Sequence, residues 1–353
     1  MLTQILVPLD GSPLADRALP YAVALGRATG ARLTLLHVTA TSEAEEAAAA
    51  LDARAEQVRA GGVIVDARVY LIADGQVADA ILRVAREDAA DLIVMSTHGR
   101  SGIGRWIYGS VADRVLGLAQ TPVLLVPAGC THTWPTDRPL RVLVPLDGSA
   151  LADEALHWAV ALADVLKADL HLLQAVEPPT YLTTEGVMLS DPEPLLAEAR
   201  RYLEGVAETL RRPERRVSFE AVSGWPAQEI AAVARQAGVD LIVMATHGRT
   251  GLARLVLGSV ATGTVQRATV PVLLVRPVAL RRPAPDLAAG EPLSAGPGRP
   301  AQRLTLVLTP AERDLLVRAL RELWFALEED ERAERQARAL LARLEALAAS
   351  ERA

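Results

Sequence analysis

The residues best suited to chemistry are two copies of a small-residue loop followed at a fixed distance by a Gly-Ser pair. Nine residues separate Ser96-Thr97-His98-Gly99 from Gly109-Ser110, and nine separate Ala245-Thr246-His247-Gly248 from Gly258-Ser259. Each copy follows an apolar run of strand length and precedes a helical pattern. Unpaired backbone N–H groups and the positive end of a helix dipole would then face one turn. The spacing predicts an anion cradle in each half, with phosphate as its natural occupant.

The elements that must position these loops alternate between strand and helix. The apolar runs at 92–95 and 241–244 show no polar alternation, which is typical of strands covered on both faces in a parallel sheet. In the first half, strands are expected at 4–9, 31–38, 63–71, 92–95 and 123–127. Helical patterns separate them, the first capped by Ser12 with Pro13 at its first position and running to about Gly30. This alternation predicts an α/β fold with a doubly wound, five-stranded parallel sheet.

The second half repeats the pattern from residue 141 but carries twelve extra residues between its second and third strands. They fall within 177–194, a proline-rich connection that we interpret either as a lid over the phosphate loop or as a tolerated surface insertion. The expected domains are 1–128 and 140–279, joined by a linker at 129–139. A disordered linker at 280–302 precedes a strand and mainly helical segment at 303–353, whose apolar stripes predict self-association or docking.

Composition excludes several classes of function. The net charge is −6, so no electrostatic footprint for nucleic acid is present. The lone cysteine, Cys130, rules out an intramolecular disulfide and fits a reducing compartment. No signal peptide and no apolar run of about 18 residues occur, so we expect a cytoplasmic protein without a membrane span. Lys167 is the single lysine, which excludes a Gly-Lys-Ser/Thr phosphate-binding loop.

With these motifs, the chain resembles the nucleotide-binding branch of the universal stress protein family. That branch carries Gly-x-x-Gly, nine residues and Gly-Ser or Gly-Thr. The first glycine is replaced here by Ser96 in one copy and by Ala245 in the other, which puts affinity in question more than fold. The resemblance covers roughly 1–128 and 139–279. It implies two tandem sheets of strand order 3-2-1-4-5, in which a ligand binds at the carboxyl ends of strands one and four, where the order reverses.

The resemblance also implies a set of ligand contacts in each half. The end of the first strand would lie by the base and ribose, and the end of the second strand would pack against the adenine. The end of the fourth strand would form the floor of the pocket. The glycine-rich positions and an arginine would contact the phosphates. In the first half these positions are Pro8, Asp10, Val38, Met95, Ser96, Gly99, Arg100, Gly109, Ser110 and Val111. In the second half they are Pro145, Asp147, Ala175, Met244, Ala245, Gly248, Arg249, Gly258, Ser259 and Val260.

Several of these residues have a simpler structural interpretation. Asp10 could cap the first helix, Gly99 and Gly109 could serve tight turns, and Met95 and Met244 could belong to the core. Ala175 is smaller than Val38, which weakens the expected base contact in the second half. His98 and His247 repeat, but a loop histidine holds backbone more often than it transfers protons. We therefore assign no catalytic residue and no protein metal site.

Three functions remain open from the sequence. The first is an ATP-binding stress-response or signalling protein, with Mg²⁺ held through the phosphates. The second is a slow ATP hydrolase or nucleotide transferase, although neither Asp10 nor Asp147 has a partner carboxylate nearby in sequence. The third is a nucleotide-free interaction protein. The last strands, 123–126 and 272–275, are apolar sheet edges, which predicts an internal pseudo-dimer of the two halves, with homo-oligomers formed through 303–353.

Overall fold

The computed structural model describes residues 2–72, 76–97, 109–177, 180–183, 186–189, 191–246 and 257–276. The predictions for 280–302 and 303–353 fall outside this part of the chain. Within it, no helix has both the length and the apolar character needed to cross a membrane.

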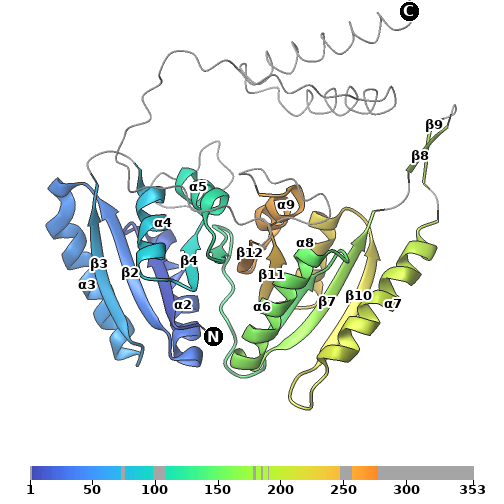
Figure 1. Ribbon diagram of the computed structural model, residues 1–353, viewed down its shortest axis with the longest axis horizontal. Helices are drawn as coiled ribbons and strands as arrows, with labels where there is room; N and C mark the ends of the chain where they lie inside the picture. The colour runs from blue at the N-terminus through green and yellow to red at the C-terminus, as the bar shows by residue number, and fades with distance from the viewer. Residues whose placement is uncertain are drawn as a thin grey trace, which may run out of the picture. The chain divides into compact units, whose positions relative to one another are not determined.

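The first half alternates strands and helices as the sequence predicts (Figure 1). Its elements are β1 (Gln4–Pro8), α1 (Pro13–Asp16), α2 (Leu19–Thr29), β2 (Arg32–Thr39), the short 3₁₀ turn η1 (Thr41–Glu43), α3 (Ala44–Ala60), β3 (Val65–Leu71), α4 (Val77–Glu87), β4 (Leu92–Ser96), α5 (Ser110–Leu118) and β5 (Val123–Val126). The expected helix from Pro13 to Gly30 is divided into α1 and α2. Pro20 lies at the start of α2, where its missing N–H breaks no helical hydrogen bond.

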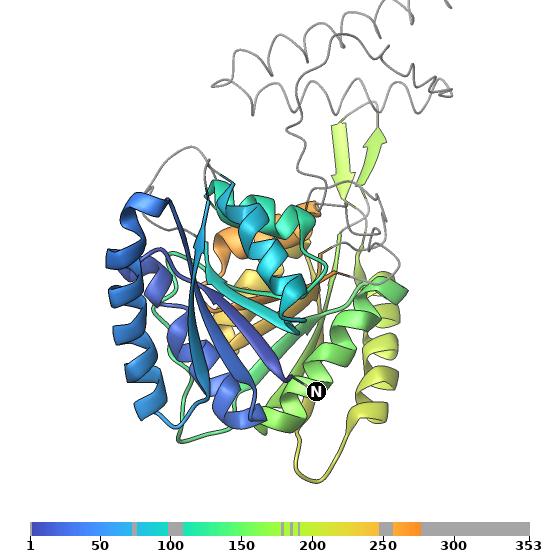
Figure 2. The same ribbon diagram turned by 60° about the vertical axis from the view of Figure 1, so that its left-hand side comes forward.

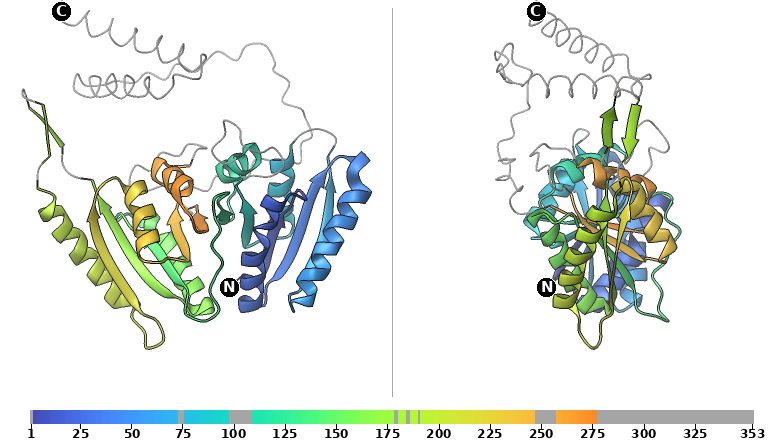
Figure 3. Two further views of the ribbon diagram at one scale, coloured as in Figure 1. Left: turned by 180° about the vertical axis from the view of Figure 1, so that it is seen from behind. Right: turned by 90° about the vertical axis from the view of Figure 1, so that its right-hand side faces the viewer.

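The second half repeats the order, with one addition. Its elements are β6 (Arg141–Pro145), α6 (Ala150–Leu166), β7 (Asp169–Val176), β8 (Thr180–Thr183), β9 (Gly186–Leu189), α7 (Glu193–Leu210), β10 (Val217–Ser223), α8 (Pro226–Gln236), β11 (Leu241–Ala245), α9 (Ser259–Arg267) and β12 (Val272–Val275). The addition is the antiparallel hairpin β8–β9 within the inserted residues, drawn beyond the carboxyl end of β7 (Figure 3).

Among the described residues, all strands outside this hairpin form one ten-stranded sheet. Its order is β10-β7-β6-β11-β12-β5-β4-β1-β2-β3, so each half has the order 3-2-1-4-5. Neighbours within each half are parallel, whereas β12 and β5 pair antiparallel, with Leu273 opposite Leu124. The two apolar edge strands therefore complete each other's hydrogen bonding and leave neither edge open.

Helices cover both faces of the sheet, and the two faces carry separate apolar clusters (Figure 2). One cluster packs the strands against α2, α3, α6 and α7, and the other packs them against α4, α5, α8 and α9. Ile5 and Leu6, adjacent on β1, point to opposite faces and are both completely buried. Burying a side chain of this size contributes about 1.5–3 kcal/mol, which is why the central strands consist of uninterrupted apolar residues.

Candidate functional site

β1 and β4 are neighbours in the sheet and pair over their amino-terminal residues, and β6 and β11 do the same in the second half. Ile5 lies opposite Leu92 in the first half, and Val142 lies opposite Leu241 in the second. The order reverses between these strands, since β2 continues from β1 on one side and β5 from β4 on the other. The two repeated loops of each half thus begin at neighbouring points of one sheet edge, as the assumed strand order requires.

The turn after β1 is built by its aspartate. Asp10 Oδ1 accepts a hydrogen bond of 2.9 Å from the backbone N–H of Ser12, Gly11 adopts φ +78°, and Ser12 Oγ caps α1 by accepting from the N–H of Ala15 at 3.1 Å. The backbone N–H of Leu9 bonds the carbonyl of β2 residue Leu36 at 2.8 Å. One carboxylate oxygen of Asp10 therefore shapes the turn by holding the N–H of Ser12, and Ser12 is the cap of α1, as the sequence predicts.

The second half repeats this turn closely. Asp147 Oδ1 accepts from the backbone N–H of Ser149 at 3.0 Å and from its hydroxyl at 2.6 Å, and Gly148 adopts φ +77°. Burial raises the pKa of Tyr202 on α7, with the nearby charges of Asp153 and Asp147 adding to the effect. The Tyr202 hydroxyl therefore stays protonated in the vicinity of this turn.

The end of β4 supplies a buried and polar floor. Met95 is buried in the cluster beneath α4 and α5, and Met244 is its equivalent in the second half, so both belong to the core. Ser96 faces the other side and is 7% exposed. Its Oγ has no hydrogen-bond partner among the described residues. A buried hydroxyl without a partner costs about 1–3 kcal/mol, so a ligand group at this edge would relieve it. Ala245 offers no such group.

The helices after the fourth strands differ at their first glycine. Gly109 precedes α5 with φ +74° and ψ +145°, a region that favours glycine. Gly258 precedes α9 with φ −61° and ψ +153°, and its N–H bonds the carbonyl of Thr246 at 2.9 Å. In each helix the first-turn N–H groups, including those of Ser110 and Val111 in α5, have no acceptor within the helix itself.

Some of the remaining predicted contacts lie in described strands and helices, and the others lie outside the described residues. Val38 is half-buried at the end of β2, and Ala175 is half-buried near the end of β7 opposite Val222. Pro8 and Pro145 end their strands and Ser259 and Val260 open α9, as expected. The predicted phosphate contacts Gly99, Arg100, Gly248 and Arg249, with the two repeated histidines, lie outside the described residues. Over the part of the chain that is described, no cluster of three or more metal-ligating side chains occurs.

Two polar clusters escaped sequence reasoning. On β7, His171 Nδ1 lies 2.8 Å from Ser218 Oγ and its Nε2 lies 2.8 Å from Glu220 Oε1, both on β10. The parallel register places Ser218 opposite His171, which no sequence spacing reveals. These contacts give each ring nitrogen of the buried His171 a hydrogen-bond partner.

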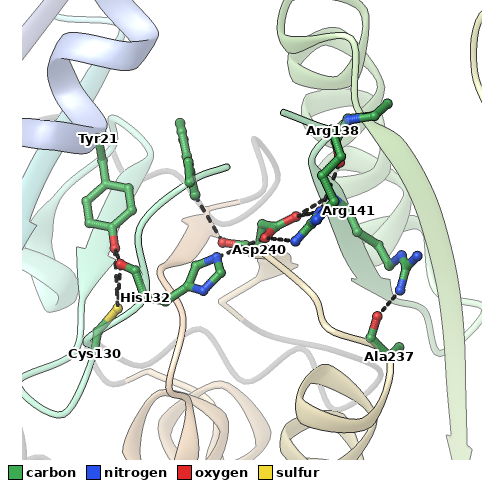
Figure 4. Close-up of polar contacts among 9 residues, drawn as sticks. Tyr21, Cys130, His132, Arg138, Arg141, Ala237 and Asp240 are labelled. Carbon is green, nitrogen blue, oxygen red and sulfur yellow. Dashed lines mark hydrogen bonds and ion pairs between the residues drawn. The ribbon is translucent and has the colours of Figure 1, made fainter. Parts of the chain in front are cut away.

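The second cluster surrounds Asp240, at the sheet edge away from the strand carboxyl ends (Figure 4). Asp240 is completely buried and accepts from His132 at 2.9 Å, from Arg138 at 2.7 and 2.8 Å, and from the backbone N–H of Arg141 at 2.7 Å. The first aspartate of the repeated stretch was a sequence signal for this role, since it opens both copies.

Comparison with known proteins gives matches to the same two halves of the chain. The model of the universal stress protein family matches residues 1–127 and 140–276. A universal stress protein of Mycolicibacterium smegmatis is 29% identical over 296 residues, covering 77% of this chain and 97% of that protein. Universal stress protein MJ0531 of Methanocaldococcus jannaschii is 34% identical over 138 residues, 38% of this chain and 81% of the relative.

Among solved structures, a putative universal stress protein from Pseudomonas aeruginosa has the same fold. It aligns with a TM-score of 0.61 and 20% identity over 79% of this chain and 95% of its own. The matched family covers both halves, with the linker between them outside the match. The chain therefore belongs to the universal stress protein family.

Proposed function

We propose that this protein binds adenine nucleotides, ATP first among them, and acts as a stress-response or signalling binder in which occupancy biases conformation. The observation that carries the proposal is that the two strands leading into the repeated turns are neighbours in the sheet. The aspartate-built turn follows β1, and the adjacent strand β4 leads into the loop that ends at the glycine before α5; β6, β11 and α9 repeat this order. N–H groups at a helix start suit phosphate oxygens, and half-buried Val38 suits the face of a base.

The residues present fit such a ligand. Ser96 Oγ is buried without a protein partner in the described chain and lies at the edge where the ligand would sit. The Gly109 conformation is one that only glycine adopts without strain. The N–H groups of Ser110 and Val111 would hold phosphate oxygens, and Mg²⁺ would enter only through those phosphates. A bound nucleotide would supply the phosphate charge and the base that are recognised, and the residues of this chain would position the phosphates and the base.

The pairing of β5 with β12 supports a second aspect of the proposal. Family members with one domain need a second copy to cover this edge, as the resemblance implies, and here the second copy is the other half of the chain. We therefore propose an internal pseudo-dimer in which both candidate sites belong to one polypeptide.

Calorimetry with ATP, ADP, AMP and cyclic AMP tests the nucleotide proposal. The double variant Gly109→Val with Gly258→Val places side chains in both cradles, so we expect at least roughly tenfold weaker ATP binding, with unchanged circular dichroism. Gly205→Val is the matched control, because an added Cβ there on α7 meets no atom within 4 Å; it should bind like the wild type. Unchanged ATP affinity in the double variant would reject the site.

A phosphate-release assay tests the alternative that the protein is an ATP hydrolase. If multiple-turnover phosphate release exceeds the uncatalysed background and disappears in Asp10→Asn, a hydrolase is favoured over a binder. We expect release to remain at background, because one carboxylate oxygen of Asp10 is already engaged by the backbone N–H of Ser12 at 2.9 Å and phosphoryl transfer needs a positioned nucleophile as well as a metal.

A further inference from the structure

We propose that the two candidate sites are not equivalent: the site in the first half binds the nucleotide tightly, and the site in the second half binds weakly because part of its cradle is already bonded within the protein. This inference rests on the proposed nucleotide binding and specifies which half carries it. Three independent differences between the halves point the same way.

The first difference is the orientation of the cradle glycine. Gly109 has φ +74°, whereas Gly258 has φ −61°, so the two peptide planes are turned relative to each other by more than a right angle about the N–Cα bond. The Gly258 N–H already donates to the carbonyl of Thr246 at 2.9 Å. A phosphate that recruits this N–H must first break that bond, and the cost reduces affinity in the second half.

The second difference is a hydroxyl. Ser96 is nine-tenths buried and its Oγ lacks a partner in the described chain, while the same position in the second half is Ala245. A ligand oxygen that bonds the Ser96 hydroxyl satisfies a group that is otherwise buried without a hydrogen bond. The second half has no such group to satisfy.

The third difference is the apolar contact for the base. Val38 is half-buried and packs against the cluster beneath α4 and α5. Ala175 replaces it at the end of β7 and presents less apolar surface. Because the gain from burial scales with apolar area, a base would gain less in the second half.

The test uses the full chain with one half altered at a time. Gly109→Ala adds a Cβ where φ is +74° and should weaken the tighter ATP-binding event by roughly tenfold, equivalent to about 1.4 kcal/mol. Gly258→Ala adds the same atom where φ is −61°, a conformation that alanine adopts freely, and should leave that event within about twofold. Isothermal titration calorimetry measures both, and thermal melting shows that each variant folds.

A second pair of variants tests the hydroxyl. Ser96→Ala should weaken the tighter event by roughly threefold to tenfold, the loss expected of one hydrogen bond, and Ala245→Ser should leave it unchanged. Two binding events of equal affinity, or loss of the tighter event in Gly258→Ala alone, overturn the inference while leaving the proposed function intact. If the wild-type chain binds none of the nucleotides tested, the proposed function fails, and the inference fails with it.

Discussion

Asp91 and Asp240 open the two copies of the repeated stretch, and each ties the start of a fourth strand to the start of a first strand. Asp91 Oδ2 accepts from the backbone N–H of Thr3 at 2.7 Å, from its hydroxyl at 2.7 Å, and from the N–H of Gln4 at 3.1 Å. Asp240 makes the corresponding bond to Arg141. These bonds lie at the amino ends of the strands whose carboxyl ends form the candidate sites, so they help fix the strand register there.

The pH dependence of stability tests the role of Asp91. Burial alone raises the pKa of Asp91, but hydrogen bonds from Thr3 and Gln4 outweigh it and hold the pKa below its ordinary value. A lowered folded-state pKa stabilises the protein above the unfolded pKa of about 4, and that stability is lost as pH falls through the folded value. We expect Asp91→Asn to reduce the free energy of unfolding by about 1–2 kcal/mol at pH 7 and by less at pH 3, as measured by urea unfolding.

The control for this prediction is an aspartate whose partner is an exposed arginine. Asp66 lies 2.7 Å from Arg32, but both side chains are more than half exposed. Asp66→Asn should therefore change stability by less than about 0.5 kcal/mol. An Asp91→Asn deficit that is the same at pH 3 and pH 7 would show that the carboxylate charge is not what stabilises the strand pair.

At the level of single residues, the sequence indicates where the turns lie but not how each peptide is oriented. Small residues recur at fixed spacing, and that spacing identifies both loops. Gly109 and Gly258 have the same following residues, Ser and Val, yet their φ values have opposite signs. A peptide's orientation depends on which carbonyl lies within reach, here that of Thr246, and tertiary structure decides this. The same limit explains why the His171 cluster was missed.

Among the elements, strand order and alternation follow from sequence because apolar runs and helical periodicity are strong local signals. Two elements differ from expectation for local reasons. Proline at position 20 favours a new helix start, so the first helix is divided, whereas α6 has His157 at the corresponding position and is continuous. The inserted connection contains the hairpin β8–β9. The two adjacent prolines at 178–179 favour a loop over a strand in the sequence, so the hairpin is not predicted from it.

Helix α5 depends on a residue from the other half of the chain. Arg276, which follows β12 and is 8% exposed, donates from one guanidinium nitrogen to the carbonyls of Leu116 at 2.9 Å and Gly117 at 2.8 Å. These carbonyls lie in the last turn of α5, where a cation is favoured by the helix dipole. The opposite end of the same helix begins at Ser110, so the second half helps to hold the candidate phosphate cradle of the first.

We expect Arg276→Met to lower the free energy of unfolding by roughly 2–3 kcal/mol, because two buried carbonyls lose a charged donor. Hydrogen exchange of α5 should accelerate more than that of α9. The matched control is Arg267→Met, since Arg267 donates to the carbonyl of Gly263 within its own helix at 3.0 Å; its cost should stay below about 1 kcal/mol. Equal costs for the two variants would rule out a special role for Arg276.

At the scale of the molecule, the two halves share one sheet and both apolar clusters. Each cluster contains residues of β5 together with residues of β12, so the core continues across the junction. Sequence reasoning identified these strands as edges because they end their repeats and lack charge. For residues 129–139 the sequence predicts a linker, since the threonines and prolines there give no periodic signal.

The linker is in fact packed against both halves. Cys130 is buried, and the Tyr21 hydroxyl of α2 lies 3.4 Å from its sulfur and donates to the carbonyl of His132 (Figure 4). Burial raises the pKa of Tyr21, and the neighbouring thiol adds to this. Trp134 packs edge-on against the Tyr21 ring at 5.2 Å and donates from its indole to the carbonyl of Asp240 at 3.0 Å. The linker therefore connects α2 of the first half to β11 of the second.

Asp240→Asn tests whether this arrangement holds the linker in place. The amide keeps the shape of the side chain but removes the negative charge that Arg138 and His132 contact. The hydrogen bond from Arg138 to Asp240 raises the pKa of Arg138, so the charged form of the arginine is stabilised by the aspartate. Breaking a buried charge network costs several kcal/mol, so we expect a loss of roughly 2–4 kcal/mol in unfolding free energy. Hydrogen exchange over residues 128–139 should accelerate at the same time.

Arg138→Ala is the graded control for that experiment. Its side chain is 45% exposed, so its loss leaves Asp240 with His132 and the backbone N–H of Arg141, and the destabilisation should be smaller than that of Asp240→Asn. If both variants exchange at the wild-type rate over the linker, the contacts at Asp240 do not hold it. The junction between the halves would then depend on the β5–β12 pair and on the contact of Arg276 with α5, which join the halves independently of the linker.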